Sequence, residues 1–114
     1  MTYRVVFLKS AQAELKSLYA NYLLPRFGAD VAREKYLAIK NAVELLKSNP
    51  RLGRSVPELS ETGFEHYRQM IVEGLNKIIY QIDDEKKMVY VHIFCSTRQD
   101  FETIFRVRLL SREE

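Results

Sequence analysis

The sequence predicts an α+β domain, in which a small antiparallel sheet carries an antiparallel helical hairpin on one face. Two stretches predict the sheet: residues 75–82 and 88–95 are rich in Ile, Val, Tyr and Phe and flank a purely charged link. Apolar residues at helical spacing between residues 11 and 47 predict the two helices. The order is therefore strand, helix, helix and three strands, with a short C-terminal helix at the end.

The length and composition indicate one ordinary globular domain covering residues 1–114. The chain is 46% hydrophobic and 29% charged, so it can bury enough apolar surface to fold without a metal or a disulfide. Its single cysteine, Cys95, lies in an apolar stretch, which favours a reducing, cytoplasmic setting. No apolar run approaches the ~20 residues of a membrane span, and the N-terminus does not resemble a signal peptide.

The first half of the chain should hold one strand and both helices. Residues 3–8 have the composition of a short strand. Ser10 is expected to cap a helix that ends just before the proline at position 25, because the residue before a proline disfavours helical geometry. A second helix is expected from Asp30, its cap, to about Lys47. Helices joined by about five residues pack as an antiparallel hairpin.

The second half should form the rest of the sheet. Residues 51–63 are rich in Gly, Pro, Ser and Thr and are interpreted as a loop. A strand over residues 64–72, a turn at residues 73–74 and the next strand predict a hairpin. Residues 88–95 are apolar at almost every position, whereas a strand with one wet face would alternate. This strand is therefore expected inside the sheet, with helices on one face and another layer on the other.

The familiar catalytic and cofactor motifs are missing from the sequence. Neither His66 nor His92 has a second histidine or a cysteine at metal-ligand spacing, so no metal is expected. The glycines are scattered, which leaves no phosphate-binding loop and no expected cofactor. Cys95 and His92 are three residues apart on one predicted strand and should point to opposite faces, so Cys95 is interpreted as a buried core thiol.

The distribution of charge indicates the kind of partner. The net charge is +3, and basic residues outnumber acidic ones between residues 26 and 54, so an acidic partner is favoured there. A set of polar residues surrounds the predicted sheet: Arg68, Gln69, Lys77, Arg98, Gln99 and Asp100. They are either solvated strand positions or a face that meets an acidic surface or a phosphate backbone, which arginine binds through its planar fork.

Several short segments, in order, resemble the RelE/ParE toxin superfamily. The first strand leads into Ser10-Ala11, the second helix ends in Asn49 to Gly53, a strand runs from Gly63 to Arg68, and Thr97 to Asp100 follows the last strand. The likeness extends over nearly the whole chain. It implies the toxin half of a type II toxin–antitoxin pair, with a cognate antitoxin as partner in a hetero-oligomer.

The RelE branch of this superfamily implies a metal-independent endoribonuclease that cuts mRNA on the ribosome. That chemistry needs a base, cations around the phosphorane and an acid for the leaving oxygen. Arg68, Lys77 and Arg98 fall on basic positions of the family's set. The family also uses a late tyrosine or histidine, but no such residue follows Asp100 in this chain. This departure counts against nuclease activity.

The ParE branch implies inhibition of DNA gyrase by protein–protein contact, which needs no catalytic residue. The long helical hairpin and the segment from Thr97 to Asp100 look more like this branch, although Ser96 stands where many relatives carry histidine. The leading expectation is therefore a ParE-like gyrase inhibitor, with the RelE-like nuclease as the alternative. An inactive toxin kept only as a partner of the antitoxin or its operator complex is the third hypothesis. The candidate target contacts are Arg68, Lys77, Arg98, Gln99 and Asp100.

An antitoxin contact follows from physical reasoning as well as from the resemblance. Antitoxin tails fold on binding and cover an apolar groove, and a positively charged toxin suits an acidic tail. The candidate groove lies between the helical hairpin and the sheet edge, with Tyr19, Tyr22 and Phe64 as aromatic anchors. Ordinary core packing is the alternative explanation for these three residues.

Overall fold

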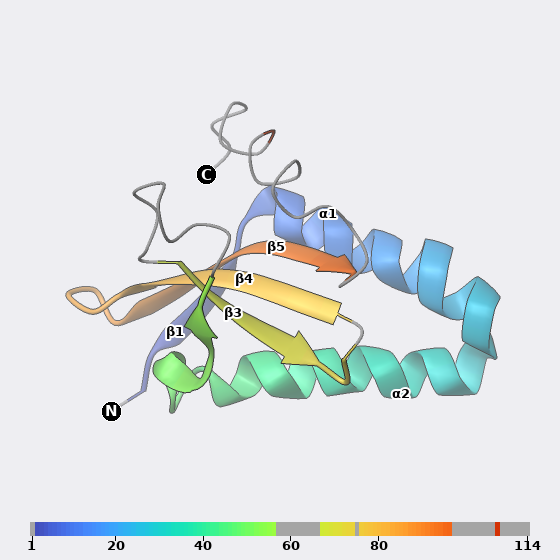
Figure 1. Cartoon of the computed structure of the whole chain (residues 1–114), viewed down its shortest axis with the longest axis horizontal. Coiled ribbons are helices and arrows are strands. Elements are labelled where there is room, and N and C mark those ends of the chain that lie inside the picture. Colours follow the sequence, from blue (N-terminus) through green and yellow to red (C-terminus); the bar gives the residue numbers. More distant parts are fainter. Residues whose placement is uncertain (1, 57–66, 75, 97–106, 108–114) are drawn as a thin grey trace.

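In the computed structural model, which describes residues 2–56, 67–74, 76–96 and 107, a five-stranded sheet is covered on one face by a helical hairpin (Figure 1). The sheet order is β1-β5-β4-β3-β2. The α+β class predicted from the sequence is confirmed. The elements are β1 Arg4–Phe7, α1 Lys9–Ser17, the π-helix η1 Leu18–Leu23, α2 Leu24–Leu45, the 3-10 helix η2 Pro50–Leu52, β2 Arg54–Ser55, β3 Tyr67–Val72, β4 Asn76–Asp83 and β5 Met88–Ser96.

The pairing of β1 corrects one detail of the prediction, because the sheet is mixed rather than antiparallel. β1 runs parallel to β5, with Arg4 opposite Met88 and Phe7 opposite Val91. The helical hairpin returns the chain to the start of β1, where the backbone nitrogen of Tyr3 donates to the carbonyl of Lys47 at 2.8 Å. β3, β4 and β5 then form an antiparallel meander, and its last strand, β5, points in the same direction as β1. Long intervening segments permit such parallel pairing, and composition does not reveal it.

The opposite edge of the sheet holds a strand that the sequence did not indicate. β2 has only two residues and lies inside the predicted loop of residues 51–63. Arg54 pairs with Gln69, and Ser55 pairs with Arg68. Both β2 residues are exposed and polar, so no apolar pattern identified them. The other four strands agree with the predictions to within a few residues, although the start of the predicted strand 64–72 lies outside the described residues.

The helix boundaries differ from the prediction at three places. Leu8 occupies the N-cap of α1 and no side chain caps this helix, so the predicted Ser10 cap is wrong. The chain stays helical through Pro25, which lies where η1 passes directly into the first turn of α2. The break occurs instead at Gly28, with φ 82° and ψ 170°. Asp30 therefore lies within α2, after the break, and is not its cap.

The core lies between the helical hairpin and the sheet. In Figure 1, α1 and α2 run in opposite directions and meet at one end of the molecule. Fully or almost fully buried side chains meet across this interface: Ala11, Leu15, Ile39, Val43 and Leu46 from the helices, and Ile78, Tyr80, Val89 and Val91 from the sheet. Burying each large aliphatic side chain contributes about 1.5–3 kcal/mol. This interface is the main source of stability.

The other face of the sheet, here called the second face, also carries buried residues. Ile79 and Ile93 pair across β4 and β5, and both are fully buried. Strand β5 is therefore buried on both faces, which confirms the interior position predicted from its apolar run. Beyond β5 the structure describes only Val107, so the predicted short C-terminal helix lies outside the described residues. None of the described helices is long and apolar enough to span a membrane.

A β-bulge in β5 changes which side chains share a face. Ile79 pairs with Ile93 and Tyr80 pairs with Val91, so His92 is the extra residue. Cys95 pairs with Lys77 on the second face, and His92 contacts the side chain of Gln81, which lies on the same face. The prediction that His92 and Cys95 point to opposite faces is therefore wrong, because the bulge interrupts the strand alternation.

Candidate functional site

Arg68 lies on the face of β3 that meets the helices, beside Tyr80, its pairing partner. Its side chain is half-buried, and its Nη1 donates a hydrogen bond to the carbonyl of Gly53 at 2.6 Å. The backbone N–H of Gly53 donates to the hydroxyl of Tyr80 at 2.8 Å. The Arg68 guanidinium therefore serves to hold the segment between η2 and β2 against the sheet.

Lys77 lies on the second face and so points away from Arg68. It pairs with Ile71 on one side and Cys95 on the other. Partners in an antiparallel pair share a face, so Arg68 lies on the face of Tyr80. Lys77 is three positions from Tyr80 along β4, so Arg68 and Lys77 occupy opposite faces. The structure does not bring these two candidate cations together. Lys77 is half-buried.

The remaining candidate target contacts and one candidate anchor cannot be placed. Arg98, Gln99 and Asp100 follow β5 directly, and Phe64 precedes β3, but all four lie outside the described residues. Their roles in contacting a target or an antitoxin therefore stay predictions.

Tyr67 and His92 form a ring contact that the sequence reasoning missed. Their ring centroids lie 5.0 Å apart at an interplanar angle of 80°. The Nε2 of His92 lies 3.1 Å from Oε1 of Gln81, and burial raises the pKa of Tyr67 above its usual value. These residues are distant in sequence and meet only because of the β3–β4 register and the bulge at His92. No periodicity in the sequence could have indicated them.

Of the two tyrosines predicted as antitoxin anchors, Tyr19 packs between the helices, and Tyr22 packs against residues just before the break at Gly28. Tyr19 in η1 and Tyr36 in α2 meet edge to face, with ring centroids 5.3 Å apart. Tyr22 packs against Phe27 at 6.4 Å, and the guanidinium carbon of Arg26 lies 5.1 Å from the Tyr22 ring centroid. Tyr19 and Tyr22 are half-buried. Tyr19 therefore lines a space between the two helices rather than one at the sheet edge.

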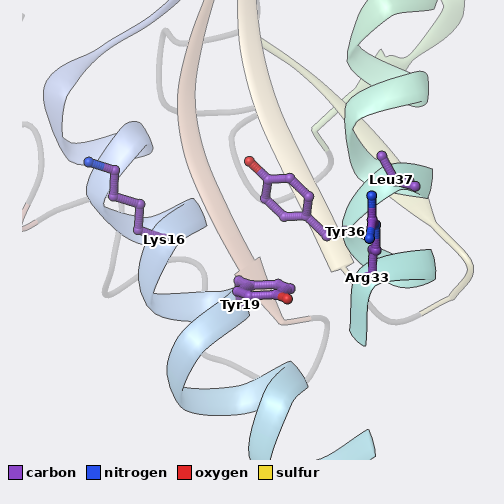
Figure 2. Close-up of a pocket in the computed structure, with 5 residues that line it drawn as sticks. All are labelled: Lys16, Tyr19, Arg33, Tyr36 and Leu37. Atoms are coloured by element: carbon purple, nitrogen blue, oxygen red, sulfur yellow. The ribbon is translucent and has the colours of Figure 1, made fainter. Parts of the chain in front are cut away.

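That space is a hollow of about 620 Å³, here called the hairpin groove. Figure 2 shows Tyr36 reaching from α2 towards the opposite helix, with Tyr19 on the η1 side. Lys16 stands on the α1 wall, and Arg33 stands on the α2 wall. The lining residues are Lys16, Tyr19, Arg33, Tyr36 and Leu37. The groove therefore combines aromatic rings, an exposed leucine and two cations.

A smaller hollow of about 280 Å³ lies at the edge of the sheet, here called the edge hollow. Its two exposed apolar residues are Leu52 and Ile71, which are 47% and 43% exposed. Gln69 is buried beside them, and its Oε1 has no hydrogen-bond partner among the described residues. Its lining residues are Leu52, Gly53, Arg54, Gln69, Met70 and Ile71. Such a combination of exposed apolar side chains and an unpaired amide is costly unless a partner covers it.

Within the described ranges, no three His, Cys, Asp or Glu side chains come close enough together to hold a metal ion.

The fold of this chain resembles the folds of solved toxin–antitoxin proteins. Similar folds occur in the chromosomal ParDE system of P. aeruginosa, at 17% identity over 83% of this chain and 96% of that chain, with a TM-score of 0.65. The RelBE2 toxin–antitoxin complex of Mycobacterium tuberculosis matches at 20% identity, covering 84% and 99%, with a TM-score of 0.60. A mutant of the E. coli toxin RelE in the free state matches at 17% identity, covering 86% of each chain, with a TM-score of 0.57.

The family is given by the sequence itself. A model of the ParE toxin of type II toxin–antitoxin system, parDE, matches residues 5–111. Among curated proteins, none matches the sequence. The chain belongs to the ParE toxin family, and the superfamily expected from the sequence is confirmed.

Proposed function

We propose that this toxin inhibits DNA gyrase by protein–protein contact and that a cognate antitoxin neutralises it in the cytoplasm. The observation that carries the proposal is the separation of Arg68 and Lys77 on opposite faces of the sheet. The match to the ParE family model over residues 5–111 agrees with it.

The separation matters because of what RNA cleavage requires. Attack by a ribose 2′-hydroxyl needs a base, an acid and cations that all surround one phosphate. Arg68 is already engaged by the carbonyl of Gly53 at 2.6 Å, on the face that meets the helices. Lys77 lies on the other face. A protein contact has no such need for convergence, because separate residues can each meet a different part of a large partner.

A supercoiling assay with purified gyrase tests the proposal. Excess toxin is expected to block supercoiling and to trap cleaved DNA, and addition of the antitoxin should restore activity. Alanine variants of Arg98 and Lys77 should weaken inhibition if these residues contact gyrase, whereas Lys86→Ala in the exposed β4–β5 turn serves as the control. Full supercoiling and no trapped cleavage at toxin excess would rule out that gyrase as the target.

The alternative function is a RelE-like, ribosome-dependent mRNA endoribonuclease. The contact between Tyr67 and His92 favours it, because these residues could supply the proton-transfer groups that are missing after Asp100. Histidine titrates near neutral pH and can act as base or acid. Lys77 lies on the same face, which provides a cation there. In this reading Arg98 supplies the second cation and Arg68 has a structural role.

A translation extract distinguishes the two functions. The nuclease predicts site-specific cuts in translated message that His92→Ala and Arg98→Ala abolish, with Tyr90→Phe as a control on the same face. Message left intact by the wild-type toxin would remove this alternative. Harmless overexpression without antitoxin would instead favour the third hypothesis, an inactive toxin kept as a binding partner.

The antitoxin contact has support at the edge hollow. Leu52 and Ile71 are nearly half exposed, and the buried carbonyl oxygen of the Gln69 side chain has no partner in the described part of the chain. An antitoxin tail seated there would cover the two apolar side chains and could donate a hydrogen bond to Gln69. Ile71→Ser should weaken the toxin–antitoxin complex in a calorimetric titration. Unchanged affinity would exclude the edge hollow from the interface.

A further inference from the structure

The hairpin groove brings aromatic ring faces and cations together in one hollow. Tyr19 and Tyr36 meet edge to face, with ring centroids 5.3 Å apart, beside the hollow of about 620 Å³. Its volume falls in the usual range for small-molecule sites, roughly 300–1,000 Å³. In an edge-to-face pair, each ring keeps at least one face that the other ring does not touch. The groove can therefore accept a flat, aromatic ligand.

Tyr19 is the better of the two rings for stacking. The Nζ of Lys40 lies 5.9 Å from the centroid of the Tyr36 ring, so a cation already lies over that ring. Within the described ranges, no cation lies over the ring of Tyr19. Leu37, on the α2 wall, is 48% exposed and adds apolar surface that is in contact with water.

Two cations of the groove are not neutralised by the described part of the chain. Lys16 and Arg33 are exposed, and neither forms an ion pair or hydrogen bond with any described residue. Lys35, by contrast, is paired with Glu73 at 3.5 Å. The described lining has no acidic residue, so an anionic ligand would meet two attractive charges and no repulsive one there.

We propose that the hairpin groove binds a purine nucleoside triphosphate. The base stacks on Tyr19, and the base and sugar together cover Leu37 from water. The planar fork of Arg33 holds the phosphate chain from the α2 wall, and the flexible stem of Lys16 brings its ammonium to the same chain from the α1 wall (Figure 2). This site does not depend on the target of the toxin, so the inference goes beyond the proposed function.

A nucleotide accounts for the rings and the charges of the groove at once. An inorganic anion would satisfy the cations but leave Tyr19 and Leu37 in contact with water. A nucleic acid strand needs a positively charged groove that follows its backbone, whereas Lys16 and Arg33 stand on facing walls of one hollow. A chain of phosphates attached to one base can engage both walls while the base remains stacked.

The test is a calorimetric titration of the full-length toxin with ATP, adenosine and inorganic triphosphate in metal-free buffer. ATP should bind at least about 10-fold more tightly than either part alone, because only ATP makes both the stacking and the ionic contacts. GTP should bind about as tightly as ATP, since stacking tolerates either purine. If inorganic triphosphate binds as tightly as ATP, the groove is only a cluster of surface charge and the proposal is wrong.

Two sets of variants separate the contacts. Tyr19→Leu should weaken ATP binding by about 10-fold and leave the affinity for inorganic triphosphate unchanged, whereas Tyr19→Phe keeps the ring and should bind ATP as the wild type does. Lys16→Gln/Arg33→Gln should weaken ATP binding on the order of 100-fold and remove most of its salt dependence. Circular dichroism checks that each variant folds. If Tyr19→Leu does not fold, the comparison of ligands on the wild type still decides the proposal.

The control is Arg4→Gln/Lys86→Gln, which makes the same change of net charge near the start of β1 and in the β4–β5 turn. It should bind ATP almost as tightly as the wild type. An equal loss of affinity in this control would mean that only the net charge matters, which overturns the proposal.

Two further outcomes also overturn the nucleotide site. One is that ATP does not bind the wild type, which leaves the proposed inhibition of gyrase intact because supercoiling is measured separately. The other is a single-stranded oligonucleotide that binds more tightly than ATP and loses that affinity in Lys16→Gln/Arg33→Gln. That result would assign the groove to nucleic acid instead.

Discussion

The hydroxyl of Tyr80 accepts a hydrogen bond from the backbone N–H of Gly53 at 2.8 Å, and it donates one to the carbonyl of Pro50 at 2.7 Å. A single buried hydroxyl therefore links the central strand of the sheet to the segment that leads into β2. Burial raises the pKa of Tyr80, so the phenol stays protonated and can fill both roles. Arg68 strengthens the same junction through the carbonyl of Gly53.

Replacing Tyr80 with phenylalanine should destabilise the protein by about 2 kcal/mol, because the N–H of Gly53 and the carbonyl of Pro50 would be left buried without a partner. Urea unfolding followed by circular dichroism measures the change as a lower midpoint at constant slope. Tyr90→Phe is the matched control, since Tyr90 is half-buried and forms no hydrogen bond with any described residue. Equal stability of the two variants would contradict the role given to the hydroxyl.

Gly53→Ala should be about as damaging, for a steric reason. A Cβ at this position would lie 2.5 Å from the backbone oxygen of Gln69 and 2.6 Å from the hydroxyl of Tyr80. Relief requires a shift of the backbone itself, which costs about 1–3 kcal/mol. Ser55→Ala, at an exposed position on β2, should change the free energy of unfolding by less than about 0.5 kcal/mol. A stable Gly53→Ala variant would mean that this junction is looser than its contacts indicate.

The sequence predicted the helices and strands whose apolar residues recur at a regular spacing or form a continuous run. The apolar run in β5 predicted an interior strand, and the helical spacing of Leu15, Ile39 and Val43 predicted the faces that are buried. The details that were predicted wrongly or missed do not depend on the spacing of apolar residues. β2 is too short to carry a pattern, and the parallel partner of β1 lies far away in the sequence. Position 25 looked like a helix end because proline is restrictive, yet the chain stays helical there as η1 passes into α2.

For the candidate site, the sequence predicted which types of residue take part but not where they lie in the fold. Sequence reasoning selected Arg68 and Lys77 because both are basic and lie on strands, but their faces depend on the β3–β4 register. The contact of Tyr67 with His92 depends on a bulge that no local pattern reveals. Tyr19 was selected as an aromatic anchor, and its place in the hairpin groove depends on how the two helices cross.

The stability of the protein should depend on Asp84 at low pH. Hydrogen bonds from the Arg51 guanidinium, and then one from the hydroxyl of Tyr3 at 2.6 Å, lower the pKa of Asp84 from 3.8 to about 2. Because the folded pKa lies below the unfolded one, this stabilisation is complete above the unfolded pKa of 3.8 and is lost as the pH falls towards 2.

Thermal unfolding at a series of pH values tests this dependence. The midpoint for the wild type should fall between pH 3.8 and 2 more steeply than that for Asp84→Asn, which has no carboxylate to protonate. Glu85→Gln in the same exposed turn should keep the wild-type profile. The difference should shrink at high salt, because Arg51 and Asp84 are more than half exposed. Identical profiles for Asp84→Asn and the wild type would show that this ion pair does not contribute.

Gly28 should be indispensable to the helical hairpin even though it is exposed. Its φ of 82° and ψ of 170° lie in a region that essentially only glycine adopts. Apart from its chain neighbours, no described residue has an atom within 4 Å of the position of a Cβ. Gly28→Ala should therefore destabilise the protein by about 1–3 kcal/mol through backbone strain alone, measured by urea unfolding. Asparagine should not relieve the strain, because it favours the left-handed helical region, where ψ is far smaller.

Pro25→Ala provides the comparison within the same turn. It should cost less than about 1 kcal/mol, since proline in the first turn of α2 mainly restricts the unfolded chain. If Pro25→Ala were the more damaging of the two changes, the proline would set the end of the first helix and Gly28 would only follow it. If Gly28→Ala is the more damaging change, as expected, the reversal between α1 and α2 is determined by Gly28. Its backbone conformation there is one that any side chain would disfavour.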